Sequence, residues 1–208
     1  MADLQSVLFV VDDDPSVRRS LTNLLRSVGF QVQAFSTARE YLASPEVDAL
    51  GCLVVDVRLP GMSGLDLQRE VARAAVPRPI VFITGHGDIP MAVQAIQGGA
   101  VEFLTKPFRD QDLLDAIRRA IDLDHHMRLA RINLAELQRR FASLSPRESE
   151  VFEHVVAGLP NKQIATALTV SEATVKVHRG QVMHKMGAVS LPDLVTMHAK
   201  LRAGHNKS

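Results

Sequence analysis

The first 123 residues predict an α/β fold, a doubly wound five-stranded parallel sheet with helices on both faces. Short apolar runs rich in β-branched residues alternate with stretches of helical period, in five such pairs within about 120 residues. The apolar runs are nearly continuous, which is typical of parallel strands covered on both faces. The rest of the chain lacks such runs and predicts a separate all-α domain.

Each strand and helix can be assigned in order. The strands are expected at 7–11, 31–35, 52–57, 79–84 and 101–104. The helices are expected at 16–27, 38–43, 64–74, 90–98 and 111–123. In the first helix Val17, Leu21, Leu24 and Leu25 share one face. Gly29 follows where a helix C-terminus favours a residue tolerant of positive φ.

The last of these helices is expected to continue beyond the sheet. Its apolar residues alternate in steps of three and four, a pattern typical of a coiled-coil seam. The seam positions are Leu113, Ala116, Ala120, Leu123, Met127, Ala130, Leu134, Leu137, Phe141 and Leu144. Because three of them are alanine, two interpretations stand. The helix either pairs with a second copy, or packs on its own domain first and then serves as a solvated linker.

Four short helices are expected in the last 67 residues, at 146–157, 161–168, 171–186 and 191–202. Ser145, Pro146 and Glu148 provide a cap hydroxyl, a proline at the first helical position and a carboxylate at the third. The chain therefore divides into a domain over 1–123, a helical linker and candidate coiled coil over 124–141, and a four-helix domain over 142–208.

Charge divides along the same boundaries. The 208 residues carry a net charge of +1, yet residues 1–123 hold 12 basic and 16 acidic side chains, and residues 142–208 hold 8 and 5. This asymmetry favours a metal- or phosphate-handling module joined to a nucleic-acid binder. A single cysteine, Cys52, excludes a disulfide framework and fits a reducing cytoplasm. The run Val7–Val11 is too short for a signal peptide or a membrane span, so no membrane association is expected.

Acidic residues gather where strands are expected to end. Asp12 and Asp13 follow the first strand and Asp56 lies near the end of the third. Neighbouring parallel strands would bring them to one edge of the sheet, where close carboxylates need a cation such as Mg²⁺. Lys106 and Thr84 lie at the same edge, which completes a constellation for phosphoryl transfer to a carboxylate nucleophile.

Taken alone, Asp12 and Asp13 are better explained as a helix N-cap cluster. The next residue, Asp14, is expected to be a cap or an acidic rim residue rather than a ligand. The interpretation as a phosphoryl-transfer site therefore depends on the whole set of residues.

Four motifs resemble the receiver domain of two-component response regulators, which has a flavodoxin-like fold. They are VVDDDPSVR (10–18), VVDVRLPGMSG (54–64), VFITGHGD (81–88) and EFLTKPF (102–108). The resemblance covers about residues 5–123. It implies that a partner sensor histidine kinase phosphorylates Asp56. It also implies Mg²⁺ binding by Asp12, Asp13, Asp56 and the backbone carbonyl of Arg58, a switch pair of Thr84 and Phe103, and phosphate pairing by Lys106.

The stretch 161–180 is typical of a helix, a tight turn and a second helix. One stripe of the second helix is Val175, His178, Val182 and Met186, and the opposite stripe is Ala173, Lys176, Val177, Gly180 and His184. An exposed lysine beside small or apolar residues suits the DNA major groove, where lysine reads guanine and valine contacts a thymine methyl. A plain helical bundle with a basic face is the alternative.

Residues 144–195 resemble the LuxR-type helix-turn-helix of the NarL/FixJ regulators, through the LSPRE opening, GLPNKQIA and TVKVH. The whole chain is most similar to FixJ-type regulators. Pattern and resemblance together predict DNA contacts by Asn161, Lys162, Thr174, Lys176, Val177, Arg179, Gly180 and Lys185. Of these, Lys162, Arg179 and Lys185 are assigned to phosphates.

The expected function is that of a cytoplasmic, non-enzymatic transcription regulator. Phosphorylation would promote a homodimer through the surface around Ile89–Leu123, as Thr84 turns to the phosphoryl group and Phe103 moves inward. The dimer would bind double-stranded promoter DNA and recruit RNA polymerase, as the resemblance implies. Two alternatives stay open. The receiver is an unphosphorylated scaffold beside the same DNA binding, or the chain is a Mg²⁺-dependent phosphohydrolase, although these usually have aspartate where Arg58 stands.

Overall fold

The structure is a computed structural model that describes residues 6–45, 49–74, 76–85 and 87–205. The chain divides into two compact units, Met1–Arg128 and Leu129–Ser208. Among the described residues, none of the helices combines the length and the apolar character that a membrane crossing requires.

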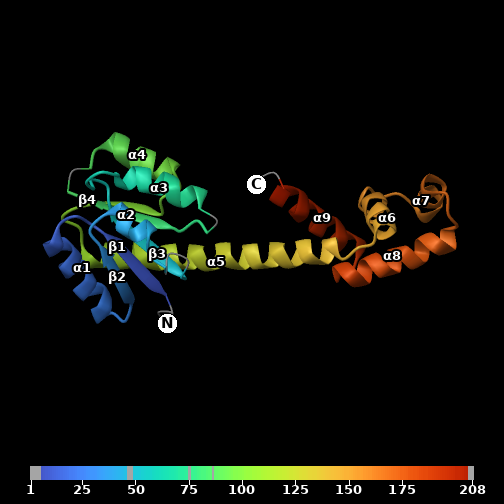
Figure 1. Cartoon of the computed structure of the whole chain (residues 1–208), viewed down its shortest axis with the longest axis horizontal. Coiled ribbons are helices and arrows are strands. Elements are labelled where there is room, and N and C mark those ends of the chain that lie inside the picture. The colour runs from blue at the N-terminus through green and yellow to red at the C-terminus, as the bar shows by residue number, and fades with distance from the viewer. Residues whose placement is uncertain (1–5, 46–48, 75, 86, 206–208) are drawn as a thin grey trace. The chain divides into compact units, whose positions relative to one another are not determined.

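The first unit is built on a parallel sheet with the strand order β2-β1-β3-β4-β5 (Figure 1). Its strands are β1 (Val7–Val11), β2 (Gln31–Phe35), β3 (Gly51–Asp56), β4 (Ile80–Thr84) and β5 (Glu102–Thr105). Its helices are α1 (Pro15–Ser27), α2 (Ala38–Leu42), α3 (Gly64–Arg73), α4 (Ile89–Gln97) and the first part of α5 (Asp110–Ala142). The predicted doubly wound, five-stranded parallel fold is confirmed, and no strand end differs from the prediction by more than one residue.

Helices cover both faces of this sheet, which explains why its central strands are apolar at every position. In β1, Leu8 and Val10 pack in the core formed with α1 and α5. Phe9 and Val11 point to the opposite face and pack in the core formed with α2, α3 and α4. Every residue of β1, β3 and β4 is buried between these helices.

Most seam residues of α5 pack in the cores of the chain itself. Leu113, Ala116 and Ala120 are buried in the core of the first unit, while Leu137 and Leu144 are buried in the core of the second unit and Phe141 packs against it. The seam positions that remain are Leu123, Met127, Ala130 and Leu134. They span fewer than two heptads, whereas a sustained coiled-coil pattern needs about three or four. The structure therefore favours the interpretation of a helix packed within its own chain.

The second unit is a helical bundle. It contains the end of α5 together with α6 (Pro146–Val156), α7 (Asn161–Leu168), α8 (Glu172–Met186) and α9 (Leu191–His205). Its core is formed by fully buried residues such as Phe152, Ile164, Val175 and Leu194. The predicted start of α6 is confirmed as a reciprocal capping box, in which Ser145 and Glu148 each bind the other's backbone N–H. The four predicted helices are all present, and α9 extends three residues beyond its predicted end.

Candidate functional site

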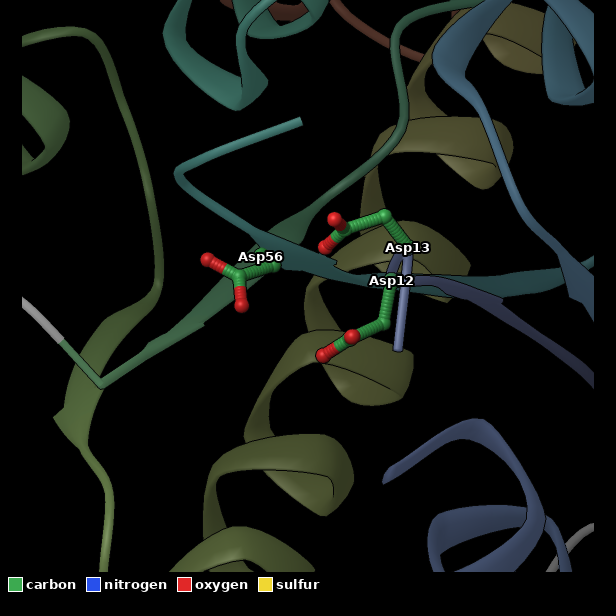
Figure 2. Close-up of side chains that lie close together, drawn as sticks. All are labelled: Asp12, Asp13 and Asp56. Atoms are coloured by element: carbon green, nitrogen blue, oxygen red, sulfur yellow. The ribbon is translucent and has the colours of Figure 1, made fainter. Parts of the chain in front are cut away.

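The carboxyl edge of the sheet brings the three predicted carboxylates together (Figure 2). Asp12 and Asp13 follow β1, and Asp56 ends β3, which pairs with β1. One carboxylate oxygen of each residue lies within 4.8 Å of the others. Asp12 is fully buried and Asp56 is 8% exposed, whereas Asp13 is exposed to solvent. The cluster is therefore reached from the side of Asp13.

Short-range hydrogen bonds fix the turn that follows β1. The backbone N–H of Asp14 donates to Asp12 Oδ1 at 2.9 Å. Asp14 Oδ1 in turn accepts the N–H groups of Ser16 and Val17, at 2.7 and 3.4 Å, so the cap role expected for Asp14 is confirmed. Arg18 Nη1 donates to the Asp12 carbonyl at 2.6 Å. Sequence reasoning missed Arg18, although its place one helical turn after the cap was an available signal.

Lys106 joins two of the carboxylates. Its Nζ lies 2.6 Å from Asp12 Oδ2 and 2.9 Å from Asp56 Oδ2. Burial lowers the pKa of Lys106, but the hydrogen bonds and charges of both aspartates outweigh burial and leave this pKa raised. The pKa of Asp12 is raised, chiefly by burial and also by the charge of Asp56, while Lys106 opposes the shift. At neutral pH the ammonium group is therefore charged and balances part of the negative charge.

The donor set fits a hard divalent cation. Three carboxylates face one lysine, so the cluster keeps an excess of negative charge. Carboxylate oxygens are the ligands that Mg²⁺ prefers, and this ion keeps several of its waters. The exposed Asp13 leaves room for those waters. Arg58, whose carbonyl was predicted as a ligand, donates its own backbone N–H to Asp56 Oδ1 at 2.9 Å and thereby orients the carboxylate.

Thr84 and Phe103, the predicted switch pair, lie close together beside the cluster. Thr84 ends β4 and is buried, and its carbonyl accepts the backbone N–H of Lys106 at 2.7 Å. Phe103, in β5, is partly buried with its ring centroid 6.2 Å from that of Phe82. A Cβ added to Gly87 would lie 2.8 Å from the Phe103 ring and 2.9 Å from the Thr84 methyl group. Both switch residues therefore border the same glycine.

The second unit presents α8 with the two stripes expected of it. Val175, Val182 and Met186 are fully buried. The opposite stripe is exposed throughout, and consists of Ala173, Lys176, Val177, Gly180 and His184. The side chain of Val177 is notable because the residue is 63% exposed, which leaves a large apolar group free for an external contact. At the helix start, the hydroxyl of Thr174 lies 2.9 Å from that of Ser171, and the Thr174 N–H donates to the Ser171 hydroxyl at 3.1 Å.

Two of the cations predicted to contact DNA phosphates have partners inside this unit. Arg179 Nη1 donates to Asn161 Oδ1 at 3.1 Å, which joins α8 to α7. Lys185 Nζ donates to Glu148 Oε2 at 2.6 Å and to the Ser143 carbonyl at 3.2 Å. The ammonium group of Lys185 therefore neutralises a buried carboxylate within this unit, and its contact with a DNA phosphate stays a prediction. The lysines that remain exposed on α7 and α8 are Lys162 and Lys176.

Comparison with known proteins agrees with both units. Residues 8–118 match the family described as response regulator receiver domain, and residues 142–198 match the family of bacterial regulatory proteins, luxR family. Nodulation protein W of Bradyrhizobium diazoefficiens is 55% identical over 205 residues, which cover 99% of this chain and 90% of that protein.

Two solved structures extend the likeness over nearly the whole chain. The low-resolution structure of the response regulator StyR has a TM-score of 0.80 and 49% identity, and the match covers 94% of this chain and 99% of that one. Full-length FixJ from B. japonicum has a TM-score of 0.57 and 40% identity, over 96% and 98% of the two chains. With a receiver domain followed by a LuxR-type DNA-binding domain, the chain belongs to the NarL/FixJ-type response regulators.

Proposed function

We propose that phosphorylation of Asp56 by a sensor histidine kinase controls the binding of this regulator to promoter DNA. The observation that carries the proposal is the ammonium group of Lys106 held between Asp12 and Asp56 in an otherwise acidic site. Burying carboxylates is costly, and a receiver that served only as a scaffold would have no use for this arrangement. A phosphohydrolase is disfavoured because Arg58 stands where such enzymes usually have an acidic residue.

The proposed reaction is a transfer to a carboxylate. An oxygen of Asp56 attacks the phosphorus atom of a phosphohistidine, the phosphorus–nitrogen bond breaks, and its electron pair stays on the imidazole nitrogen of the donor. Asp12, Asp13, Asp56 and the Arg58 carbonyl would hold Mg²⁺, which supplies positive charge near the transferred oxygens when bound. Lys106 stays within reach of the same oxygens and pairs with the product.

The proposed consequence is a change at the surface of α4 and β5. A phosphoryl group adds negative charge and acceptor oxygens, toward which the Thr84 hydroxyl turns, and Phe103 then moves inward. Ile89, Val93 and Ile96 form a stripe on α4 and are 81%, 47% and 48% exposed. A solvent-exposed stripe at this helical spacing supports a homodimer contact on this face, with β5 and α5 beside it.

The proposed DNA contacts are made mainly by the exposed stripe of α8. In a dimer, two α8 helices would enter the major groove about one DNA turn apart, with Lys176 and Val177 on base edges and Lys162 on phosphates. Recruitment of RNA polymerase in the cytoplasm is proposed from family membership. The receiver is proposed to span 1–123 and the DNA-binding domain 142–208, and the linker between them begins with Asp124 and Arg128 anchored on the first unit.

The test is the intact mass of the chain after incubation with acetyl phosphate and Mg²⁺. One added phosphoryl group is expected on the wild-type chain and none on Asp56→Asn, while the control Asp115→Asn, a half-buried position on α5, keeps the adduct. Sedimentation of the same samples should show a dimer only where the adduct forms. An adduct that survives Asp56→Asn, or wild-type and Asp56→Asn chains that bind DNA alike, would favour the scaffold alternative.

A further inference from the structure

The C-terminal end of α8 is held by residues of α5 and α6. Arg140 Nη1, in the last turn of α5, donates to the Met186 carbonyl at 3.1 Å. From α8, Lys185 Nζ donates to the Ser143 carbonyl and to the Glu148 carboxylate. We call these contacts of Arg140 and Lys185 the α8 clamp. They tie the last turn of α8 to the segment that joins α5 to α6.

The contact of Arg140 is suited to a helix C-terminus. The last carbonyls of a helix have no donor within the helix and carry partial negative charge, which a guanidinium group neutralises. Gly187 caps α8 in the left-handed conformation, with φ of 70°. A Cβ added at Gly187 would overlap Arg140 Nη1, so the glycine also leaves the space that the guanidinium group fills.

A second ion pair keeps Arg140 in this orientation. Arg140 Nε donates to Glu136 Oε1 at 2.8 Å, and Arg139 binds both oxygens of the same carboxylate at 2.8 and 2.9 Å. The hydrogen bonds of Arg139 and then Arg140 lower the pKa of Glu136 to about 2, so this carboxylate is ionised at neutral pH. Among the hydrogen bonds of the described residues, the guanidinium group of Arg139 binds Glu136 alone and does not reach α8.

We propose that Arg140 is a positioning residue for DNA recognition, because it caps α8 and so sets the orientation of the helix that carries Lys176 and Val177. The inference rests on the proposed function of α8 as the recognition helix. The pair formed by Arg179 and Asn161 holds the middle of α8, and the α8 clamp holds its end. Base contacts demand a defined orientation of the helix, whereas phosphate contacts tolerate small displacements.

The test compares Arg140→Gln with Arg139→Gln in the full-length chain phosphorylated by acetyl phosphate. Each substitution removes one positive charge that pairs with Glu136. The two variants therefore lose the same amount of nonspecific electrostatic attraction to DNA. The probes are a duplex that the wild-type chain selects from a randomised pool and a scrambled duplex of equal length, at one salt concentration. Arg140→Gln should weaken binding to the selected duplex by about tenfold, the scale of one lost base contact, relative to Arg139→Gln. The two variants should bind the scrambled duplex with equal affinity. Arg140→Lys should recover most of the affinity for the selected duplex that Arg140→Gln loses.

Equal affinities of the two variants for the selected duplex would overturn the inference, as would an equal loss on both duplexes. If Arg140→Gln is unfolded at the assay temperature, Glu136→Gln replaces it as the test variant. This substitution removes the ion-pair partner of Arg140 and leaves the charge of Arg140 in place. This variant should also lose affinity for the selected duplex relative to Arg139→Gln, and the absence of a loss refutes the inference. If the wild-type chain selects no duplex, the proposed function of α8 is refuted and the inference with it.

Discussion

The buried carboxylate of Asp124 accepts a hydrogen bond from the backbone N–H of Gly51, with 2.8 Å between Asp124 Oδ2 and Gly51 N. Arg128 binds the same carboxylate at 2.9 Å and donates to the Ala49 carbonyl, also at 2.9 Å. These contacts fasten α5 to the segment that leads into β3, the strand that ends at Asp56. Gly51 permits the approach, because a Cβ at this position would overlap the backbone of a neighbouring strand.

We expect Asp124→Asn to destabilise the first unit by about 3 kcal/mol, because it leaves Arg128, whose side chain is 22% exposed, without its counter-charge. The measurement is urea unfolding followed by the fluorescence of Tyr41. Tyr41 is the one tyrosine of a chain without tryptophan, and it is buried in the first unit. The control Asp122→Asn, on the exposed side of α5, should change stability by less than about 0.5 kcal/mol. Equal effects of the two substitutions would contradict the role given to Asp124.

The contrast between Asp56 and Asp124 explains what sequence reasoning could and could not predict. Asp56 follows an apolar run, and the topology of parallel strands alone brings strand ends together. Asp124 lies in an ordinary helical pattern, 73 residues from its partner Gly51, and no local signal indicates its burial. A long separation also hides the ion pair of Lys185, because its partner Glu148 lies 37 residues away in the sequence.

The seam of α5 shows a second limit of the sequence. Apolar residues in steps of three and four indicate a buried helix face but do not say what covers it. Leu113 and Leu137 fit a coiled coil equally well, yet each is buried in the core of its own unit. The division between the two cores depends on tertiary packing, which periodicity does not contain.

We expect Gly64→Ala to disturb the proposed phosphorylation site through the backbone of Asp56. Gly64 begins α3 and donates its N–H to the Val57 carbonyl at 2.9 Å, and an added Cβ would overlap the Asp56 carbonyl. Because backbone must shift to relieve the overlap, the first unit should lose about 2 kcal/mol and Asp56 should react more slowly with acetyl phosphate. Tyr41 fluorescence and intact mass measure the two effects. Gly85→Ala is the control, since its Cβ meets no atom within 4 Å, and an adduct that forms at the wild-type rate in Gly64→Ala would contradict the expectation.

The ion pair between Glu148 and Lys185 predicts a pH dependence of the second unit. The pKa of Glu148 lies below its ordinary value of 4.5, mainly because of the hydrogen bond from Lys185 and then that from the Ser145 N–H. The unfolded chain therefore binds this proton more tightly, so the stabilisation is fully present above about pH 4.5 and is lost as the pH falls through the lowered pKa.

Glu148→Gln should accordingly cost about 1.5 kcal/mol at neutral pH, and its difference from the wild-type chain should shrink in acid. Far-UV circular dichroism follows unfolding of both units, and Tyr41 fluorescence identifies the part that belongs to the first. Glu150→Gln is a matched control, because Glu150 lies on the same helix and pairs with Arg147 at an exposed site. A deficit of Glu148→Gln that stays constant down to acid pH would rule out the ion pair as its source.

The exposed stripe of α8 leads to a last expectation, that Lys176 contributes to sequence recognition and not only to charge. Lys176→Gln should weaken binding to a duplex selected by the wild-type chain by about 1–3 kcal/mol, and should weaken binding to a scrambled duplex much less. Lys200→Gln, which removes the same charge from an exposed site on α9, should have little effect on binding to either duplex.

Titrations at several salt concentrations separate contacts to phosphates from contacts to bases. Lys162→Gln should reduce the slope of log K against log salt by about 0.9, because one phosphate contact is lost. If Lys176→Gln weakens binding to the selected and the scrambled duplex equally, as expected for Lys162→Gln, α8 does not read bases through Lys176.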